Sequence, residues 1–231
     1  MINATDSKGT FYILNKKDRT PIIFIHGVGL DHSIWDPQIN EFDNTVLIYD
    51  ILGHGKTPLN KNDLSFDDFS DQIINLIDEL KFNKVHLVGF SIGSLIARNF
   101  ATRFNNRLAS LTLLCSIFNR SDKEQKIVND RFEQTKKDHK LTKDALKRWF
   151  TEDFLNKNPG ISDKIFNILQ NNNMNNFIKI YSLFVKHQDN EKFENIKTKT
   201  LVITGEGDVG STPEMSINLG KKSKKSVVKI I

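Results

Sequence analysis

The pentapeptide Gly89-Phe90-Ser91-Ile92-Gly93 directly follows an apolar run and precedes a stretch with helical spacing. This pattern predicts a sharp strand-to-helix turn that holds Ser91 in a strained backbone conformation. Glycines at 89 and 93 leave room for the strand and the helix to cross closely. The Ser91 hydroxyl would then stand at the carboxyl edge of a sheet, and the Ile92 amide at the start of the helix could donate to a developing oxyanion.

Runs rich in Val, Ile and Leu alternate with segments of helical spacing. The runs predict strands at Ile22–His26, Thr45–Asp50, Lys84–Val88, Leu108–Cys115, Thr200–Thr204 and Ser226–Ile231. Nearly continuous apolar strands are typical of sheets covered on both faces, so the alternation favours an α/β fold with a doubly wound, mostly parallel sheet. One helix is expected after Ser65, which acts as N-cap with Asp68 in the first turn, and another from Ser91 to about Phe104.

Residues 118–194 interrupt this rhythm with helical spacing and frequent Lys, Asn and Phe. We interpret them as a helical insertion, or lid, within a core formed by residues 1–117 and 195–231. The lid holds too many aromatic side chains for a wholly solvated arm. Most of them are expected to pack inside the lid, and a few are expected to face a pocket below it.

The loop His26-Gly27-Val28-Gly29 ends the first predicted strand. In such a loop the Val28 amide points toward the same oxyanion as the Ile92 amide, and Gly27 and Gly29 let the backbone approach a substrate closely. A plain glycine turn is the alternative. His26 is expected to brace this loop, with a role as general base as the less favoured interpretation.

A second loop, Asp50-Ile51-Leu52-Gly53-His54-Gly55, follows the next strand. Asp50 and His54 could form an acid–base pair, but we favour structural roles for both in this turn. No clustered His, Cys, Asp or Glu spacing indicates a metal ligand set, so neither a metal nor an organic cofactor is expected.

Charge and composition narrow the possible partners. The net charge of +5 comes from 33 basic and 28 acidic residues spread along the chain, which does not indicate a nucleic-acid partner. The densest basic run, at 221–225, is expected to be a solvated helix end and loop. No apolar stretch is long enough to span a bilayer, and the N-terminus lacks the pattern of a signal peptide. The single cysteine, Cys115, excludes an internal disulfide and suits a reducing cytoplasm as a buried thiol.

The motifs at residues 26–29, 50–55 and 89–93, with the spacing between them, resemble those of the α/β-hydrolase superfamily. The resemblance extends to Gly205-Glu206-Gly207-Asp208 after a later strand and covers nearly the whole chain, most weakly in the lid. Narrower features resemble the branch that contains 3-oxoadipate enol-lactonases and related esterases. These features are the run from His26 to His32 with Trp35, and the residues Gly210-Ser211-Thr212-Pro213.

The resemblance implies that Ser91 is a nucleophile and that Asp208 is the acid that orients a histidine. From the residues themselves, Asp208 follows a predicted strand, so its carboxylate should emerge on the same sheet edge as Ser91. Glu206 and Asp122 are alternative acids. Asp208 could instead cap the next helix, although Thr212 or Ser211 is better placed for that.

The histidine that should act as general base is not found where the resemblance places it. In that family it lies after the last strand, and no histidine follows Asp208 here. Among the six histidines, His187 in the lid is the least unsuitable substitute. The terminal helix that normally covers one sheet face is absent too. We therefore expect that about 30 residues of the active protein are missing, and that the 231-residue chain is almost inactive.

For a complete protein the sequence predicts a serine hydrolase of a small carboxylic ester or lactone, working through an acyl-enzyme, with no nucleic-acid or membrane partner. Cofactor-free haloperoxidase or C–C bond hydrolase activity stays open within the superfamily. The competing class is a non-catalytic protein, either a hydrolase fold that binds a small molecule or a decayed remnant. The missing histidine is the argument for that class.

Overall fold

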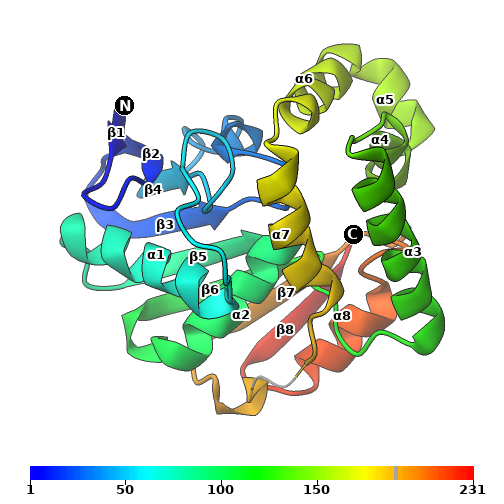
Figure 1. The fold of residues 1–231 in the computed structure, drawn as a ribbon. Coiled ribbons are helices and arrows are strands. Elements are labelled where there is room, and N and C mark those ends of the chain that lie inside the picture. Colours follow the sequence, from blue (N-terminus) through cyan, green and yellow to red (C-terminus); the bar gives the residue numbers. More distant parts are fainter. Residues whose placement is uncertain (190–191) are drawn as a thin grey trace.

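The computed structural model describes residues 1–189 and 192–231, and its centre is one eight-stranded sheet (Figure 1). The strand order is β1-β2-β4-β3-β5-β6-β7-β8. The strands β1 and β2 pair antiparallel, and the six strands from β3 onward run parallel. Their bounds are Ile2–Thr5 (β1), Phe11–Asn15 (β2), Arg19–Ile25 (β3), Asn44–Tyr49 (β4), Val85–Phe90 (β5), Leu108–Leu114 (β6), Thr200–Thr204 (β7) and Ser226–Ile230 (β8).

This sheet confirms the predicted α/β class and all six predicted strands, each within a few residues. The central strands are buried on both faces because helices or loops cover them, which explains why they carry almost no polar alternation. Strands β1 and β2 were not predicted. Both strands are short, with β1 at the sheet edge and β2 between β1 and β4, and their antiparallel pairing places them outside the strand–helix rhythm.

Three helices connect the parallel strands and pack in one continuous core against the sheet. They are α1 (Phe66–Glu79), α2 (Ile92–Arg103) and α8 (Pro213–Gly220). The start of α1 carries the expected capping box, in which the Asp68 carboxylate accepts the Ser65 amide at 2.8 Å. The start of α8 is capped by Thr212, whose hydroxyl accepts the Met215 amide at 3.3 Å. Asp208 therefore does not cap this helix.

The opposite sheet face carries a smaller apolar cluster around Trp35, in the short 3-10 helix η1 (His32–Trp35). Two further 3-10 helices are η2 (Asn105–Arg107) and η3 (Phe193–Asn195). No helix among the described residues has the length and apolar character needed to cross a membrane.

Five helices lie between β6 and β7 in the chain and gather on one side of the molecule (Figure 1). They are α3 (Asp122–Asp138), α4 (Asp144–Trp149), α5 (Glu152–Lys157), α6 (Pro159–Gln170) and α7 (Met174–Val185). Helix α7 lies against the loops at the carboxyl edge of the sheet, because Phe177 packs on Gly29 and Ile180 packs on Gly53. We call this segment the insertion; residues 190–191 of the predicted lid lie outside the described residues.

Candidate functional site

The turn between β5 and α2 holds Ser91 at φ +56° and ψ −120°, a conformation that non-glycine residues rarely adopt. Such strain costs on the order of 1–3 kcal/mol and persists only where the surrounding structure enforces it. The Ser91 amide donates to the Leu114 carbonyl at 2.9 Å, which ties the turn to the neighbouring strand β6. The side chain of Ser91 is half-buried. The hydroxyl therefore sits on a rigid, strained support.

Both flanking glycines are required by the close crossing of strand and helix. A Cβ atom at Gly93 would lie 2.6 Å from the Ile25 carbonyl oxygen, and one at Gly89 would overlap the backbone of Gly93. These atoms are backbone and cannot rotate away. The sequence pattern of small residues two before and two after Ser91 thus has a direct steric cause.

Two backbone amides near this turn have no acceptor among the described residues. One belongs to Ile92, the first residue of α2, where intrahelical partners are lacking and the helix dipole is positive. The other belongs to Val28, in the loop after β3, the strand next to β5. Both residues lie at the carboxyl edge of adjacent strands, which is the arrangement needed to bind a negatively charged oxygen.

The loop that carries Val28 is held by two buried histidines. His26 hydrogen-bonds through Nδ1 to the Gly27 carbonyl at 2.8 Å, and its Nε2 accepts the Ile51 amide at 3.1 Å. His54 accepts the Gly29 amide at Nε2, also at 2.8 Å. Burial lowers the pKa of His26, and burial together with the nearby His26 ring lowers the pKa of His54 to about 3. Both rings are therefore neutral, and their nitrogen atoms are engaged in hydrogen bonds with backbone groups.

Asp50 is fully buried beneath the same loop and accepts hydrogen bonds from the His32 amide, the His32 ring and the Lys56 amide at 2.7–2.8 Å. The pKa of Asp50 is lowered although burial alone would raise it, because the hydrogen bonds from His32 and Lys56 favour the carboxylate. The geometry agrees with the structural role favoured for Asp50. Ligand-type atoms of Asp31, His32 and Asp50 lie within 4.8 Å of one another, but they are already engaged in hydrogen bonds.

Asp208 lies in the loop after β7 and is half-buried. Its Oδ1 accepts the amides of Gly210 and Ser211, each at 2.8 Å, and the Thr204 hydroxyl donates to Oδ2 at 3.3 Å. The carboxylate is thus fixed by its own loop. Of the two alternative acids, Glu206 is exposed and Asp122 begins α3 in the insertion.

Cys115 lies between the strand ends that carry Ser91 and Asp208. It follows β6, which pairs with β5 on one side and β7 on the other, and its amide donates to the Ile203 carbonyl at 2.8 Å. Burial and the neighbouring Asp208 carboxylate raise the pKa of the Cys115 thiol to about 12. Because adjacent strands are spaced about 4.8 Å apart, β5 and β7 are separated by about 10 Å at this edge.

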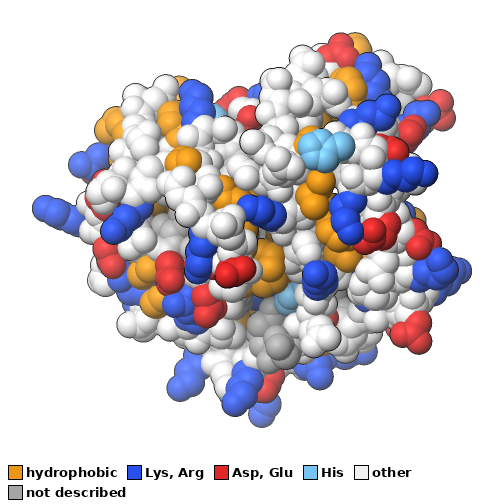
Figure 2. All heavy atoms as spheres, viewed as in Figure 1, with side chains coloured by type: hydrophobic (Ala, Val, Ile, Leu, Met, Phe, Trp, Pro, Cys, Tyr) orange, Lys and Arg blue, Asp and Glu red, His pale blue; other side chains and the backbone are white. Residues whose placement is uncertain are grey.

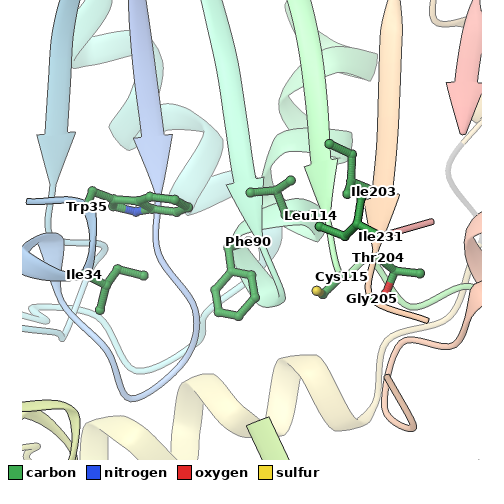
Figure 3. Close-up of a pocket in the computed structure, with 9 residues that line it drawn as sticks. All are labelled: Ile34, Trp35, Phe90, Leu114, Cys115, Ile203, Thr204, Gly205 and Ile231. Carbon is green, nitrogen blue, oxygen red and sulfur yellow. The ribbon is translucent and has the colours of Figure 1, made fainter. Parts of the chain in front are cut away.

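A cavity of about 310 Å³ opens at these strand ends, and nearly all of its lining is apolar (Figure 3). Phe90, the residue before Ser91, lies at its centre beside Leu114 and Cys115, with Ile34 and Trp35 on one side and Ile203, Thr204, Gly205 and Ile231 on the other. The sequence predicted Cys115 as a buried structural thiol. The structure instead places Cys115 half-buried in the cavity wall. Its backbone has a φ of +50°, which could not be predicted from the pattern of side chains.

None of the six histidines hydrogen-bonds to Ser91 or Asp208 in the described chain. Besides His26, His32 and His54, His86 contacts the Ser110 hydroxyl at 2.7 Å, His139 contacts Asn175 at 3.2 Å and His187 lies 3.4 Å from Asp189. No histidine follows Asp208 in the sequence. The structure brings the ends of β5, β6 and β7 together but leaves this edge without an imidazole among the described residues.

Comparison with known proteins places the chain among related sequences and folds. The family model for the alpha/beta hydrolase fold matches residues 20–231. An (E)-2-((N-methylformamido)methylene)succinate hydrolase from Acinetobacter baylyi is 28% identical over 96% of this chain and 85% of its own length. The 3-oxoadipate enol-lactonase 1 of the same organism is 25% identical over 92% of this chain and 80% of its own length.

Solved structures agree on the fold. The enol-lactonase from Burkholderia xenovorans LB400 superposes with a TM-score of 0.87 at 22% identity, covering 100% of this chain and 91% of that one. A hydrolase from Pseudomonas aeruginosa PA01 gives the same TM-score at 17% identity, covering 100% of this chain and 89% of that one. The sequence relatives support a hydrolase with a small-molecule substrate. The chain belongs to the alpha/beta hydrolase fold family.

Proposed function

We propose that the chain carries the site of a serine hydrolase that cleaves a small carboxylic ester or lactone through an acyl-enzyme. Ser91 is the nucleophile, and the amides of Val28 and Ile92 form the oxyanion hole. Asp208 is the acid that orients a histidine. The observation that carries the proposal is the φ of +56° at Ser91 in the turn between β5 and α2, because a strained strand-to-helix turn of this kind presents a serine hydroxyl at the sheet edge.

The reaction then runs in two halves. The Ser91 oxygen attacks the carbonyl carbon as its proton passes to a general base, and the two amides stabilise the negative oxygen of the tetrahedral intermediate. Collapse of this intermediate expels the alcohol or enol oxygen, which takes the proton back. A water molecule then attacks the carbonyl carbon of the acyl-enzyme by the same steps, which releases the carboxylic acid and restores the Ser91 hydroxyl. In a lactone the leaving oxygen stays attached to the acyl chain, so ring opening precedes release.

The general base is an imidazole above the end of β6, between Ser91 and Asp208. The Cys115 backbone occupies that strand end, and the apolar cavity beside it has room for a small ring. Since every histidine of the chain contacts other groups, we propose that the 231-residue chain alone is almost inactive. Triads that lose one member retain only about 10³–10⁴-fold acceleration over water.

The substrate proposal rests on the relatives. An enol-lactonase aligns along most of the chain, and the cavity lined by Phe90, the residue before Ser91, is apolar, which suits the hydrocarbon part of a small ester or lactone. A second candidate function is non-catalytic binding of a small molecule by the same fold. The observation that favours it is the set of six histidines that all contact other groups.

Chemical rescue by imidazole separates these two candidates. Imidazole added to the 231-residue chain should raise hydrolysis of p-nitrophenyl acetate above the rate of imidazole with the Ser91→Ala variant, since the free base can occupy the space beside Asp208. The Asp208→Asn variant should lose most of the rescue, because a neutral amide replaces the carboxylate that would hold the imidazole N–H and stabilise the imidazolium. Equal rates for the wild-type chain and Ser91→Ala at every imidazole concentration would exclude the hydrolase proposal and favour the binder.

A further inference from the structure

The side chain of Asn172, at the junction of α6 and α7, extends from the insertion to the loop that carries Val28. Its Nδ2 donates to the Gly29 carbonyl at 2.8 Å. The same nitrogen donates to the carbonyls of Ile168 and Leu169 at 3.0 and 3.2 Å, in the last turn of α6. Capping of α6 accounts for these two longer contacts. It does not account for the shortest one, which joins residues 143 positions apart in the chain.

Residues 27–30 of this loop form a tight turn. The Leu30 amide donates to the Gly27 carbonyl at 3.2 Å. Gly29, the third residue of the turn, has a φ of +78°, and Val28 is not among the residues with positive φ. A hydrogen-bonded turn with positive φ only at its third residue corresponds to type II, which favours glycine there. The orientation of each peptide group in the turn is therefore defined.

Asn172 and the turn form one chain of hydrogen bonds that ends at the Val28 amide. Asn172 donates to the Gly29 carbonyl, and the N–H of that same peptide group, on Leu30, donates to the Gly27 carbonyl. A trans peptide holds its C=O and N–H on opposite sides, so the Val28 N–H points away from the turn as the free end of the chain. Hydrogen bonds arranged head to tail polarise one another, which strengthens the last donor.

The turn is held from two sides. The two buried histidines bind it from the core side, at the Gly27 carbonyl and the Gly29 amide. On the insertion side, a Cβ atom at Gly29 would lie 2.9 Å from the Phe177 ring and 3.1 Å from the Leu169 side chain, so both side chains pack against the turn. Asn172 adds a directional contact to this packing. Figure 1 shows the junction of α6 and α7 beside the loops at the sheet edge, and Figure 2 shows few charged or hydrophobic side chains over it.

We propose that Asn172 is a positioning residue of the oxyanion hole, which couples the position of the insertion to the direction and strength of the Val28 N–H donor. This inference rests on the proposed hydrolase function for the role of that donor. Asn172 acts through two peptide groups and does not touch the reacting atoms. If the junction of α6 and α7 moves away from the loop, the chain of hydrogen bonds loses its first donor. Ser91 then stays in place, but stabilisation of the tetrahedral intermediate is weakened.

Hydrogen exchange of the Gly29 amide measures this coupling without any catalysis. Asn172→Ala should raise the exchange rate of that amide by about fivefold or more, the factor expected when one hydrogen bond that holds the turn is lost. Asn172→Asp, which keeps the shape but replaces the donor with a carboxylate, should have the same effect. The amides of β5 should exchange at the wild-type rate in both variants, which shows that the variants are folded.

Asn173→Ala is the matched control at the same junction. It removes the N-cap of α7, where the Asn173 side chain accepts the Asn176 amide at 3.1 Å, but leaves the contact between Asn172 and Gly29 in place. The Gly29 amide should exchange in this variant as it does in the wild type. A general loosening of the junction would instead accelerate exchange in both the Asn172 and the Asn173 variants.

Two esters test the oxyanion hole itself. Imidazole-rescued hydrolysis of p-nitrophenyl acetate is compared with that of its thiono analogue, whose C=S accepts hydrogen bonds more weakly, after subtraction of the rate with Ser91→Ala. Asn172→Ala should lower the preference for the oxygen ester by about tenfold, less than the loss when an oxyanion donor is removed outright. The change should appear in kcat at constant KM, because the donor acts on the negative oxygen of the intermediate. Asn173→Ala should keep the wild-type preference.

Unchanged Gly29 exchange in both Asn172 variants, or an unchanged ester preference in Asn172→Ala, would overturn the inference. An effect of Asn173→Ala as large as that of Asn172→Ala would overturn it too. The two proposals fail separately. Faster Gly29 exchange in the Asn172 variants, without imidazole rescue of the wild-type chain, would count against the hydrolase alone. Rescue of the wild type with unchanged exchange in the variants would count against the coupling alone.

Discussion

The guanidinium of Arg98 lies 2.6 Å from the carboxylate of Asp189, and these two residues join the helix that starts after Ser91 to the end of the insertion. Arg98 is 1% exposed and also donates to the Ile117 carbonyl at 2.9 Å, while Asp189 accepts the Asn119 amide at 2.7 Å. One buried ion pair therefore holds both ends of the insertion against α2. The pair fixes the chain just after α7, the helix that packs on Gly29 and Gly53.

Replacing one partner of this pair should be costly. Arg98→Met leaves the Asp189 carboxylate without its main counter-charge in a buried site, so we expect a loss of about 3–5 kcal/mol in the free energy of unfolding. Urea denaturation measures it. The control is Arg103→Met, which removes partly exposed pairs with Asp71 at 2.8 Å and Asp67 at 3.7 Å and should cost less than about 1 kcal/mol. Equal losses in the two variants would show that the Arg98 pair is not buried as described.

Glycine at position 93 should be irreplaceable. In Gly93→Ala the new methyl group would press on the Ile25 carbonyl, and overpacking against backbone is expected to cost about 3 kcal/mol or more and to displace Ser91. Gly160→Ala in α6 is the matched control: nothing lies within 4 Å of the added atom, so stability should stay constant or rise by up to about 1 kcal/mol. Thermal unfolding of both variants decides the point, and a Gly93→Ala protein as stable as Gly160→Ala would refute the crossing geometry.

The sequence was sufficient to predict those strands, turns and helix starts that are determined by residues close together in the chain. Periodicity located the six parallel strands, and the spacing of glycines around Ser91 predicted the strained turn that the structure shows. The role of Ser65 as the N-cap of α1 could likewise be predicted, because its partner Asp68 is three residues away in the chain. The roles of Ser91, Asp208, Val28 and Ile92 in chemistry stay predictions, although their placement at one sheet edge agrees with them.

Features built from distant residues could not be predicted in this way. Arg98 occurs in an ordinary helical pattern, and only its pairing with a residue 91 positions later makes its burial tolerable.

Acid should destabilise the protein through His54. Its folded pKa is about 3, below the ordinary value of 6.5, so the folded state binds fewer protons than the unfolded state between these values. Stability is therefore complete above about pH 6.5 and falls as the pH drops toward 3, by at most about 1.4 kcal/mol per pH unit for this group. The physical cause is burial, which disfavours the charged ring, and a ring protonated at Nε2 could not accept the Gly29 amide.

The His54→Gln variant tests this acid sensitivity, because glutamine can accept a hydrogen bond and does not titrate. Denaturation at pH 7 and pH 5 should show a smaller drop in unfolding free energy for the variant than for the wild type, with the remaining drop attributable to His26 and His86, whose pKa values are also lowered by burial. Identical drops in both proteins would mean that His54 stays neutral in the unfolded state or is not buried.

Cys115 should report directly on the position of Asp208. Burial and the Asp208 carboxylate raise the pKa of the thiol to about 12, so at pH 8 the native chain should react with iodoacetamide at least about tenfold more slowly than the urea-unfolded chain. Because the chain has a single cysteine, intact-mass spectrometry follows the reaction without ambiguity. Asp208→Asn should accelerate alkylation of the native protein, since it removes the negative charge beside the thiol and leaves the burial unchanged. Glu206→Gln, an exposed carboxylate on the same loop, is the control and should react at the wild-type rate. If Asp208→Asn also reacts at the wild-type rate, the carboxylate does not lie against the end of β6, and the proposed line of Ser91, imidazole and Asp208 across β5, β6 and β7 fails with it.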